Sequence, residues 1–362
     1  MSNWPDWLPL RDQLRPLTPY GAPQVPAIAR MNTNENPYGP SQELSNSIAT
    51  RVGEVAQSLN RYPDRDCIKL RKGLADYLNS LSATNLNLEN IWVANGSNEI
   101  LQSIFLAFGS RRALGFTPSY SMHPLIAKVA SVDWIDGKRR EDFTLDLEKA
   151  LTQISESKPA LTFITTPNNP TGTSVSISDI EKLAAKCKSI DGLLIIDEAY
   201  AEFSSQLSAI TLIDKYPNLL VSRTMSKAFA FAGARVGYLA ANKQVIDALQ
   251  LVRLPYHLSA LTQAAAEVAL EFKEELLSEV RKLAHDRDRM IEDLRLLGLK
   301  VIPSDANFLL FTGFKMPSND LWQRLLAEGV LIRDVELPGY LRVTIGNGAE
   351  NQAFLTALKG AL

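Results

Sequence analysis

The sequence predicts an α/β fold with a largely parallel sheet, followed by a smaller α+β region. Between residues 91 and 240, short apolar runs alternate with segments of helical periodicity. Strands that are apolar along their whole length are typical of parallel sheets covered by helices on both faces. The chain has 362 residues, and at roughly 150 residues per domain this is enough for two domains.

The expected elements follow from the apolar pattern in chain order. Prolines are frequent in the first 30 residues, which predicts an extended arm. The pattern then predicts strands at 91–95, 112–116, 160–165, 192–197, 219–224 and 235–240, with helices at 97–108, 118–130 and 178–188.

The C-terminal part has a different character. Residues 258–297 keep a helical period without glycine or proline. A helix of this length is long for a globular domain, so we expect a bend or a break within it. Short apolar runs on either side of a helix at 319–328 then predict a smaller α+β domain.

The composition argues against polyanionic partners. Lys and Arg total 38 and Asp and Glu total 40, so the net charge is −2, whereas nucleic acids and anionic membranes bind basic surfaces. We therefore expect no nucleic-acid partner and no membrane partner. Two cysteines outside any C-x-x-C pair and three histidines without metal-ligand spacing favour a cytoplasmic protein with no metal site.

Polar, turn-forming residues follow four of the expected strands. TTPNNPTG occupies 165–172, DEAY occupies 197–200, NGSNE occupies 95–99, and Ser226 and Lys227 follow a fourth strand. Ligands of α/β sheets bind at the carboxyl ends of the strands. The sequence therefore predicts a binding site built by these four loops.

The residue types in these loops match the functional groups of pyridoxal 5′-phosphate. A carboxylate at the end of an apolar strand, Asp197, needs a partner such as a cationic pyridine nitrogen. Lys227 lies near apolar strand ends and can form a Schiff base with an aldehyde. The other groups are matched by Gly96, Ser97, Asn98 and Arg235 for the phosphate, Tyr120 for the ring face, and Asn169 and Tyr200 for the ring hydroxyl.

Each of these residues has an ordinary structural explanation when it is taken alone. A single lysine is usually a solvated charge, and an aspartate after a strand is usually a turn or helix cap. NGSNE by itself is a typical helix N-terminus. The prediction of a site depends on their order and on their shared position at strand ends.

The order NPTG, DEAY, SK and then an arginine eight residues after the lysine resembles the fold-type I pyridoxal-phosphate aminotransferases. Three more specific segments, NENPYGPS, RYPD and RTMSKAFAFAGARVGY, are similar to the histidinol-phosphate aminotransferase branch, particularly its actinobacterial members. Similar segments extend from Leu17 to Gly346. The resemblance implies a large domain with a mostly parallel seven-stranded sheet and a smaller α+β domain.

The resemblance also implies roles for the cofactor-side residues. Lys227 would bind pyridoxal 5′-phosphate covalently and move the proton, and Asp197 would keep the ring nitrogen protonated. Tyr62 would reach the cofactor phosphate of the other subunit, so a homodimer is expected. The other implied contacts are Tyr200 and Asn169 to the ring oxygen, Tyr120 stacked on the ring, and Ser97, Asn98, Thr224, Ser226 and Arg235 around the phosphate.

On the substrate side, the resemblance implies contacts from Tyr20, Asn36, Arg333 and Arg342. Arg342 would bind the phosphate of one substrate and the carboxylate of glutamate, since a guanidinium suits both anions. The implied reaction is transamination between L-histidinol phosphate and 2-oxoglutarate in histidine biosynthesis. The alternatives are an aromatic amino-acid aminotransferase with the same fold and, more remotely, a non-catalytic binding protein built on it.

Some residues depart from the family pattern or keep two interpretations. Asn98 stands where many relatives carry an aspartate, so its contribution to the phosphate site rests on the backbone N–H. His257 either lines the site or is a packed or bridging residue. Cys67, Cys187, His123 and His285 are interpreted as structural.

The expected domains are discontinuous in sequence. The large cofactor domain is expected at residues 31–254, and the small domain is expected to combine residues 1–30 with 255–362. The active site would then lie between the domains and at the subunit interface.

Overall fold

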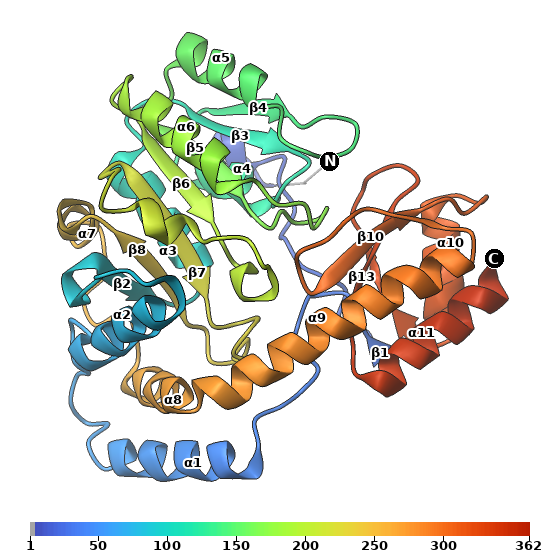
Figure 1. Cartoon of the computed structure of the whole chain (residues 1–362). Helices are drawn as coiled ribbons and strands as arrows, with labels where there is room; N and C mark the ends of the chain where they lie inside the picture. The colour runs from blue at the N-terminus through green and yellow to red at the C-terminus, as the bar shows by residue number, and fades with distance from the viewer. Residues whose placement is uncertain (1–3) are drawn as a thin grey trace.

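A mixed sheet of seven strands forms the centre of the larger part of the molecule (Figure 1). The computed structural model describes residues 4–362, so the first three residues of the expected arm lie outside it. In the described part the strand order is β2-β8-β7-β6-β5-β3-β4. Only β8 among these strands runs antiparallel to its neighbours, β2 and β7. The predicted α/β fold with a mostly parallel seven-stranded sheet is confirmed.

Most of these strands lie where the apolar runs predicted them. The run at 235–240 is an exception, because Arg235 has a left-handed φ of 58° and the strand begins only at Gly237. β4 was not predicted, because this edge strand has the half-polar sequence WIDGK. The bounds are β2 Ile91–Ala94, β3 Ala113–Thr117, β4 Trp134–Lys138, β5 Leu161–Thr165, β6 Leu193–Asp197, β7 Leu219–Thr224 and β8 Gly237–Ala241.

Helices cover both faces of the sheet, as the apolar strands require. Alternate residues of β6 enter different cores: Leu194 and Ile196 belong to one apolar cluster and Ile195 to the other. The first cluster includes residues of α2 (Ile68–Ser82), α5 (Leu147–Ser157) and α6 (Ile177–Lys188), and the second includes residues of α3 (Ser97–Phe108), α4 (Met122–Val129) and α7 (Lys243–Leu249).

The helix expected at 118–130 is shorter than predicted. It begins at Met122, which places Pro124 in the first turn. A helix starting at residue 118 would put that proline in its interior, where the ring clashes with the preceding turn and a backbone hydrogen bond is lost. Residues 118–121 therefore form a turn, and that turn carries Tyr120.

The long helical stretch is broken, as expected, into two helices. α8 spans Ala260–Glu271 and α9 spans Lys273–Leu296, with Phe272 between them. α8 packs against α2 and against α1 (Gln42–Ala56). α9 then extends from α8 to the smaller part of the molecule (Figure 1).

The smaller part contains a four-stranded sheet of order β12-β13-β10-β9 and two helices. A two-residue strand near the N-terminus, β1 (Ala29–Arg30), pairs in parallel with β11 (Val330–Leu331). An N-terminal strand therefore packs within the C-terminal part of the chain. The domain division at residues 31–254 remains a prediction.

The other bounds are β9 Lys300–Val301, β10 Phe308–Thr312, β12 Arg333–Asp334, β13 Leu341–Thr344, α10 Ser318–Ala327, α11 Gly348–Ala361, and the 3-10 turns η1 Asp12–Leu14, η2 Leu88–Asn90, η3 Ala201–Phe203 and η4 Ala209–Leu212.

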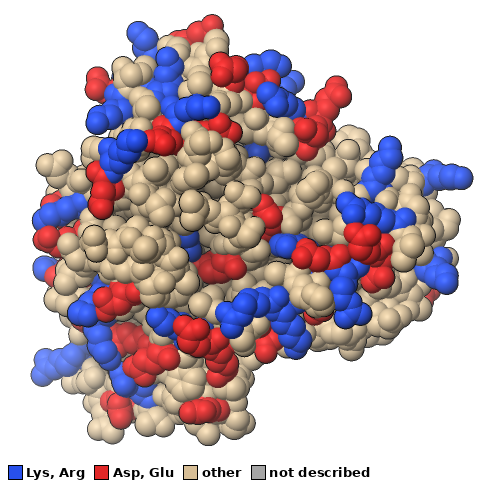
Figure 2. Space-filling model, in the orientation of Figure 1, with Lys and Arg blue, Asp and Glu red and all other residues tan. Residues whose placement is uncertain are grey.

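Acidic and basic side chains are intermingled over the visible face of the molecule (Figure 2). Among residues 4–362, no helix is long and apolar enough to cross a membrane. The same residues contain no group of three or more His, Cys, Asp or Glu side chains placed to hold a metal ion.

Candidate active site

A cavity of about 760 Å³ lies at the carboxyl ends of the parallel strands β5, β6 and β7. The loops of all four sequence motifs contribute to its lining. Of the residues predicted for the site, Asn36, Tyr62 and Gly96 do not line it. The predicted residues that do are Tyr20, Ser97, Asn98, Tyr120, Asn169, Asp197, Tyr200, Thr224, Ser226, Lys227, Arg235, Arg333 and Arg342.

Lys227 extends into this cavity from the turn after β7. Its Nζ donates a hydrogen bond to the backbone carbonyl of Thr33 at 2.8 Å. Burial, together with the positive charges of Arg342 and Arg235, lowers the pKa of Lys227 to about 8. A lysine with such a pKa is partly neutral near neutral pH, so its amine can act as a nucleophile or a base.

Asp197 is buried at the end of β6 and has a partner that the sequence did not assign. His123 Nε2 lies 3.0 Å from Asp197 Oδ2, and both side chains are 3% exposed. The backbone N–H of Ala199 also donates to Asp197 Oδ1. Because a buried carboxylate is costly without hydrogen bonds, His123 stabilises the placement of Asp197 in the cavity wall.

Tyr120 forms a second contact with the same histidine. Its ring meets His123 edge-on at a centroid distance of 5.4 Å, and its hydroxyl donates to Asn98 Oδ1 at 3.1 Å. Burial raises the pKa of Tyr120, so the phenol remains protonated. The backbone N–H of His123, in the first turn of α4, donates to the Tyr120 carbonyl. The closeness of these two residues in sequence is the signal that could have linked His123 to the site.

The N-terminus of α3 meets Arg235 at the cavity, an arrangement suited to an anion. Ser97 and Asn98 begin this helix, whose free backbone N–H groups attract anions. Arg235 Nη1 donates to Ser226 Oγ at 3.4 Å, and Thr224 Oγ1 donates to the same hydroxyl at 3.0 Å. The guanidinium is close to Gly96, where an added Cβ would be 2.5 Å from Arg235 Nη2.

A hydrogen-bond network joins the phenol of Tyr200 to Arg342. Asn34 Nδ2 and Asn169 Nδ2 donate to the Tyr200 hydroxyl at 2.9 and 3.4 Å. Arg342 Nη1 donates to Asn169 Oδ1 at 2.6 Å, and Nη2 donates to the carbonyl of Asn32 at 2.7 Å. The sequence resemblance predicted a contact from Asn36, but Asn32 and Asn34 line the cavity instead. The Asn36 side chain accepts a hydrogen bond from the Tyr38 backbone N–H.

The small sheet brings two arginines together at the cavity. Arg333 of β12 and Arg342 of β13 are directly paired across the strands. Burial lowers the pKa of Arg342 to about 10, and the charge of Arg333 contributes to this. Like charges opposite each other are unfavourable, so this pair suits an anionic ligand.

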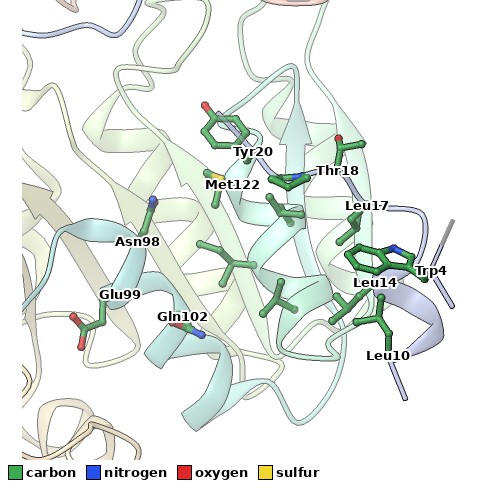
Figure 3. A pocket seen from close by; sticks show the side chains of 14 residues that line it. Trp4, Leu10, Leu14, Leu17, Thr18, Tyr20, Asn98, Glu99, Gln102 and Met122 are labelled. Carbon is green, nitrogen blue, oxygen red and sulfur yellow. The ribbon is translucent and has the colours of Figure 1, made fainter. Parts of the chain in front are cut away.

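A smaller apolar pocket of about 500 Å³ adjoins the cavity (Figure 3). The N-terminal arm forms one side of it with Leu10, Leu14 and Leu17, and Met122 lies on the opposite side. Arg11 fixes the arm to the end of α4 by donating to Ser131 Oγ and to the Val129 carbonyl. The pocket shares Thr18, Pro19, Tyr20, Asn98 and Leu125 with the larger cavity.

The remaining candidates lie outside the cavity. Tyr62 is 79% exposed and stacks on Tyr256 at 4.3 Å. His257 Nε2 donates a hydrogen bond to the Val93 carbonyl at 2.8 Å, and its ring stacks on Trp92, so it is a packed residue. Burial raises the pKa of Cys67 to about 12 and that of Cys187 to about 11; these are unreactive thiols at neutral pH.

The comparisons with known proteins define the class of protein first. The family model for aminotransferase class I and II matches residues 27–358, and the chain belongs to this family. Within it, the histidinol-phosphate aminotransferase of Mycobacterium sp. (strain JLS) is 54% identical over 353 residues, covering 97% of this chain and 93% of the relative. The chain therefore falls in the histidinol-phosphate aminotransferase branch.

Solved structures agree with this placement. The histidinol-phosphate aminotransferase of Clostridium acetobutylicum has a TM-score of 0.83 at 26% identity, covering 92% of this chain and 98% of that one. The histidinol-phosphate aminotransferase of Sinorhizobium meliloti, in complex with pyridoxal 5′-phosphate, has a TM-score of 0.81 at 26% identity and covers 93% of this chain and 91% of that one.

Proposed function

We propose that this chain transfers an amino group reversibly between L-histidinol phosphate and 2-oxoglutarate, giving imidazole-acetol phosphate and L-glutamate, as a step of histidine biosynthesis. Relatives with this name at 54% identity support the assignment. The structural observation that carries it is a single cavity that holds the amine of Lys227, the carboxylate of Asp197 and the two separate cationic sites of Arg235 and Arg342.

The residues of the cavity fit pyridoxal 5′-phosphate. When bound, this group supplies a carbonyl carbon that reacts with amines and a ring that accepts electrons from a broken bond. Arg235 and the start of α3 would hold its phosphate, because Gly96 leaves space there for the guanidinium. Asp197 would face the ring nitrogen, Tyr120 the ring face, and Tyr200 with Asn169 the ring oxygen.

Lys227 is the group in the cavity suited to move the substrate proton. Its lowered pKa provides a neutral Nζ, which can accept a proton from the substrate Cα and return it. Asp197, held by His123, is an anion that favours a protonated ring nitrogen opposite it. These two residues thus have complementary roles, a neutral base for the substrate proton and a carboxylate for the ring nitrogen.

Arg342 and Arg333 would bind the anionic end of the substrate. The phosphate of histidinol phosphate and the carboxylate of glutamate both accept hydrogen bonds from a guanidinium. Arg342 is 6% exposed, and burial strengthens its interaction with an anion. Tyr20 lines the cavity from the arm and would contact the rest of the substrate.

We further propose that the enzyme acts as a homodimer. Leu59, Tyr62, Leu251, Leu254 and Tyr256, named here the Tyr62 patch, are exposed by 41 to 86%. Their two segments are held together by the Tyr62–Tyr256 stack and by the 2.7 Å ion pair of Arg253 with Asp66. An exposed apolar patch next to such ordered contacts is typical of a protein interface. Across it, Tyr62 would reach the cofactor phosphate of the partner subunit.

We also propose a cytoplasmic location. Both cysteines are free and buried, which is typical of proteins in a reducing compartment.

Steady-state kinetics with competing amino donors tests the proposed function. The protein is loaded with pyridoxal 5′-phosphate, and kcat/KM is measured for histidinol phosphate, phenylalanine and tyrosine. We expect histidinol phosphate to have the highest value, and Lys227→Ala to abolish turnover because it removes the only proposed base. A higher kcat/KM for an aromatic amino acid would overturn the substrate assignment, and turnover by the Lys227→Ala variant would overturn the mechanism.

The second candidate, an aromatic amino-acid aminotransferase, is favoured by one observation. The apolar pocket beside Tyr20 (Figure 3) could accommodate a phenyl ring. The paired arginines, Arg333 and Arg342, favour a doubly charged phosphate over a single carboxylate. The same donor comparison separates these two functions.

A further inference from the structure

A buried ion cluster lies behind the loop that carries Asp197 and Tyr200. Arg223 donates from Nε and Nη2 to Glu198 Oε2 at 3.1 and 2.8 Å, and from Nη1 to Glu202 Oε1 at 3.0 Å. Ser208 joins it by donating to Glu198 Oε2 and accepting from Arg223 Nη2. We call Arg223, Glu198, Glu202 and Ser208 the Arg223 cluster; none of the four lines the cavity.

The strand geometry places this cluster opposite the cavity. Asp197 of β6 is paired in register with Ser222 of β7, and neighbouring residues of a strand point to opposite faces. Thr224 lines the cavity, so the preceding residue, Arg223, points to the other side. Glu198 in turn follows Asp197 and meets Arg223 there.

Residues that line the cavity and residues that bind Arg223 are interleaved along the same loop. Asp197 and Tyr200 line the cavity, whereas Glu198 and Glu202 bind the guanidinium. One side chain therefore fixes the loop at two points, immediately after Asp197 and two residues after Tyr200. The backbone N–H of Glu198 is also bonded to the Ser222 carbonyl at 2.9 Å, which ties the same loop to β7.

Burying the three charged side chains of this cluster costs free energy. The side chains of Arg223, Glu198 and Glu202 are 2 to 4% exposed. Two carboxylates share one guanidinium, and buried ion pairs of this kind are often no more stabilising than apolar residues of the same volume. Planar, two-nitrogen hydrogen bonding instead gives geometric precision, which lysine cannot reproduce.

We propose that Arg223 is a positioning residue for the cofactor, acting through Glu198 and Glu202 to fix Asp197 and Tyr200 at the ring of pyridoxal 5′-phosphate. This inference rests on the proposed function, since it takes the cofactor as the ligand of the cavity. It assigns the precision of the ring site to a cluster that touches neither cofactor nor substrate.

The test measures cofactor binding and apoprotein stability separately. Arg223→Lys keeps the charge but loses the two-nitrogen geometry, and Ser208→Ala is a milder change to the same cluster. The matched control is Arg71→Lys, since Arg71 is also buried but donates only to backbone carbonyls of Asp66, Leu88 and Ile91. Each apoprotein is titrated with pyridoxal 5′-phosphate by absorbance, the pH dependence of the bound cofactor's absorption is recorded, and Tm is measured without cofactor.

We expect Arg223→Lys to raise the Kd for pyridoxal 5′-phosphate about tenfold and to shift the pH midpoint of the bound cofactor's absorption. Ser208→Ala should change both quantities in the same direction by a smaller factor. Arg71→Lys should lower Tm and leave both quantities at the wild-type values.

Arg223 would be purely structural if its variant and the Arg71 variant lowered Tm alike while both kept the wild-type Kd and absorption midpoint. A Ser208→Ala variant that folds and binds like the wild type, alongside an unaltered Arg223→Lys spectrum, would overturn the inference in the same way. If the wild-type protein fails to bind pyridoxal 5′-phosphate, the proposed function fails and the inference fails with it. If it binds the cofactor but prefers another amino donor, only the substrate assignment fails.

Discussion

Lys227 shows how the chemistry of one residue depends on its surroundings. Its amine is enclosed at the carboxyl ends of the strands and shares the cavity with Arg342 and Arg235. Burial and these two cations all disfavour the charged form, and together they lower the pKa of Lys227 to about 8. The neutral amine is therefore available at a pH where an ordinary lysine, with a pKa of about 10.4, is almost fully protonated.

This shift predicts the pH dependence of Lys227 acylation in the apoprotein. Only the neutral amine reacts, so labelling by acetic anhydride should rise as the pH increases through about 8. Replacing Arg342 by glutamine should move the midpoint upward, because one positive charge is removed. Mass spectrometry of the Lys227 peptide measures the extent of labelling.

The urea-unfolded protein is the control for this experiment. There the same lysine should react with a midpoint near the ordinary value of about 10.4. A folded-state midpoint equal to the unfolded one would contradict the lowered pKa.

His123 is the residue whose role the sequence interpretation missed. A single histidine in GFTPSYSMH has no metal-ligand partner nearby, so it was interpreted as structural. The structure brings it to Asp197, 74 residues further along the chain. Sequence spacing gives no information about such a contact, because the turn at Tyr120 and the order of β3, β5 and β6 in the sheet together decide it.

At the scale of elements, the N-terminus of α3 depends on a glycine. Gly96 has a left-handed φ of 82° and lies against the guanidinium of Arg235. Glycine adopts this conformation, with ψ 166°, at little cost, whereas other residues are strained by about 1–3 kcal/mol. The motif NGSNE thus provides both the helix start and the space for an arginine.

We predict that Gly96→Ala weakens binding of pyridoxal 5′-phosphate at least tenfold. The added Cβ would lie 2.5 Å from Arg235 Nη2, so the guanidinium must move away from the phosphate site. A tenfold loss corresponds to about 1.4 kcal/mol. Absorbance titration of the apoprotein gives the Kd.

The matched control is Gly53→Ala, within α1. A Cβ added there would have no neighbour within 4 Å, and alanine in a helix interior is stabilising by about 0.5–1 kcal/mol relative to glycine. This variant should keep the wild-type Kd and gain stability. Equal affinities for the Gly96 and Gly53 variants would contradict the proposed phosphate site.

The small sheet provides a second example at this scale. Arg333 and Arg342 are nine residues apart in sequence, and each alone resembles an exposed cation. Pairing of β12 with β13 places them directly opposite each other at the cavity. The resemblance to a family pointed to these residues, and the strand register explains why they act together.

Across the whole molecule, the Tyr62 patch is an exposed apolar surface that its own chain does not cover. Leu251 and Leu254 are 86% and 73% exposed, on a segment that the ion pair of Arg253 with Asp66 holds in place. Tyr62 was predicted for the cofactor site but lies outside its own chain's cavity. Both facts are accounted for if a second copy of the chain covers the patch.

We predict that Leu254→Asp dissociates the dimer. A charge in the patch would lose its hydration on association, which is costly without a partner. Sedimentation velocity should show a monomer, and transamination should fall because Tyr62 of the partner subunit no longer completes the site. The comparison variant, Leu296→Asp, changes a leucine at the end of α9 that is even more exposed, at 86% against 73% for Leu254. It should remain dimeric and active. A dimeric Leu254→Asp variant would argue against this interface.

Local patterns in the sequence predict the α/β fold, most strand positions and the four loops that line the cavity. These features are local, since apolar periodicity and turn-forming residues report how each short segment is buried. The tertiary structure decided which side chains meet: His123 with Asp197, Asn34 with Tyr200, Arg333 with Arg342, and Arg223 behind the DEAY loop. Such contacts depend on strand order and register between distant segments, and no short window of sequence contains that information.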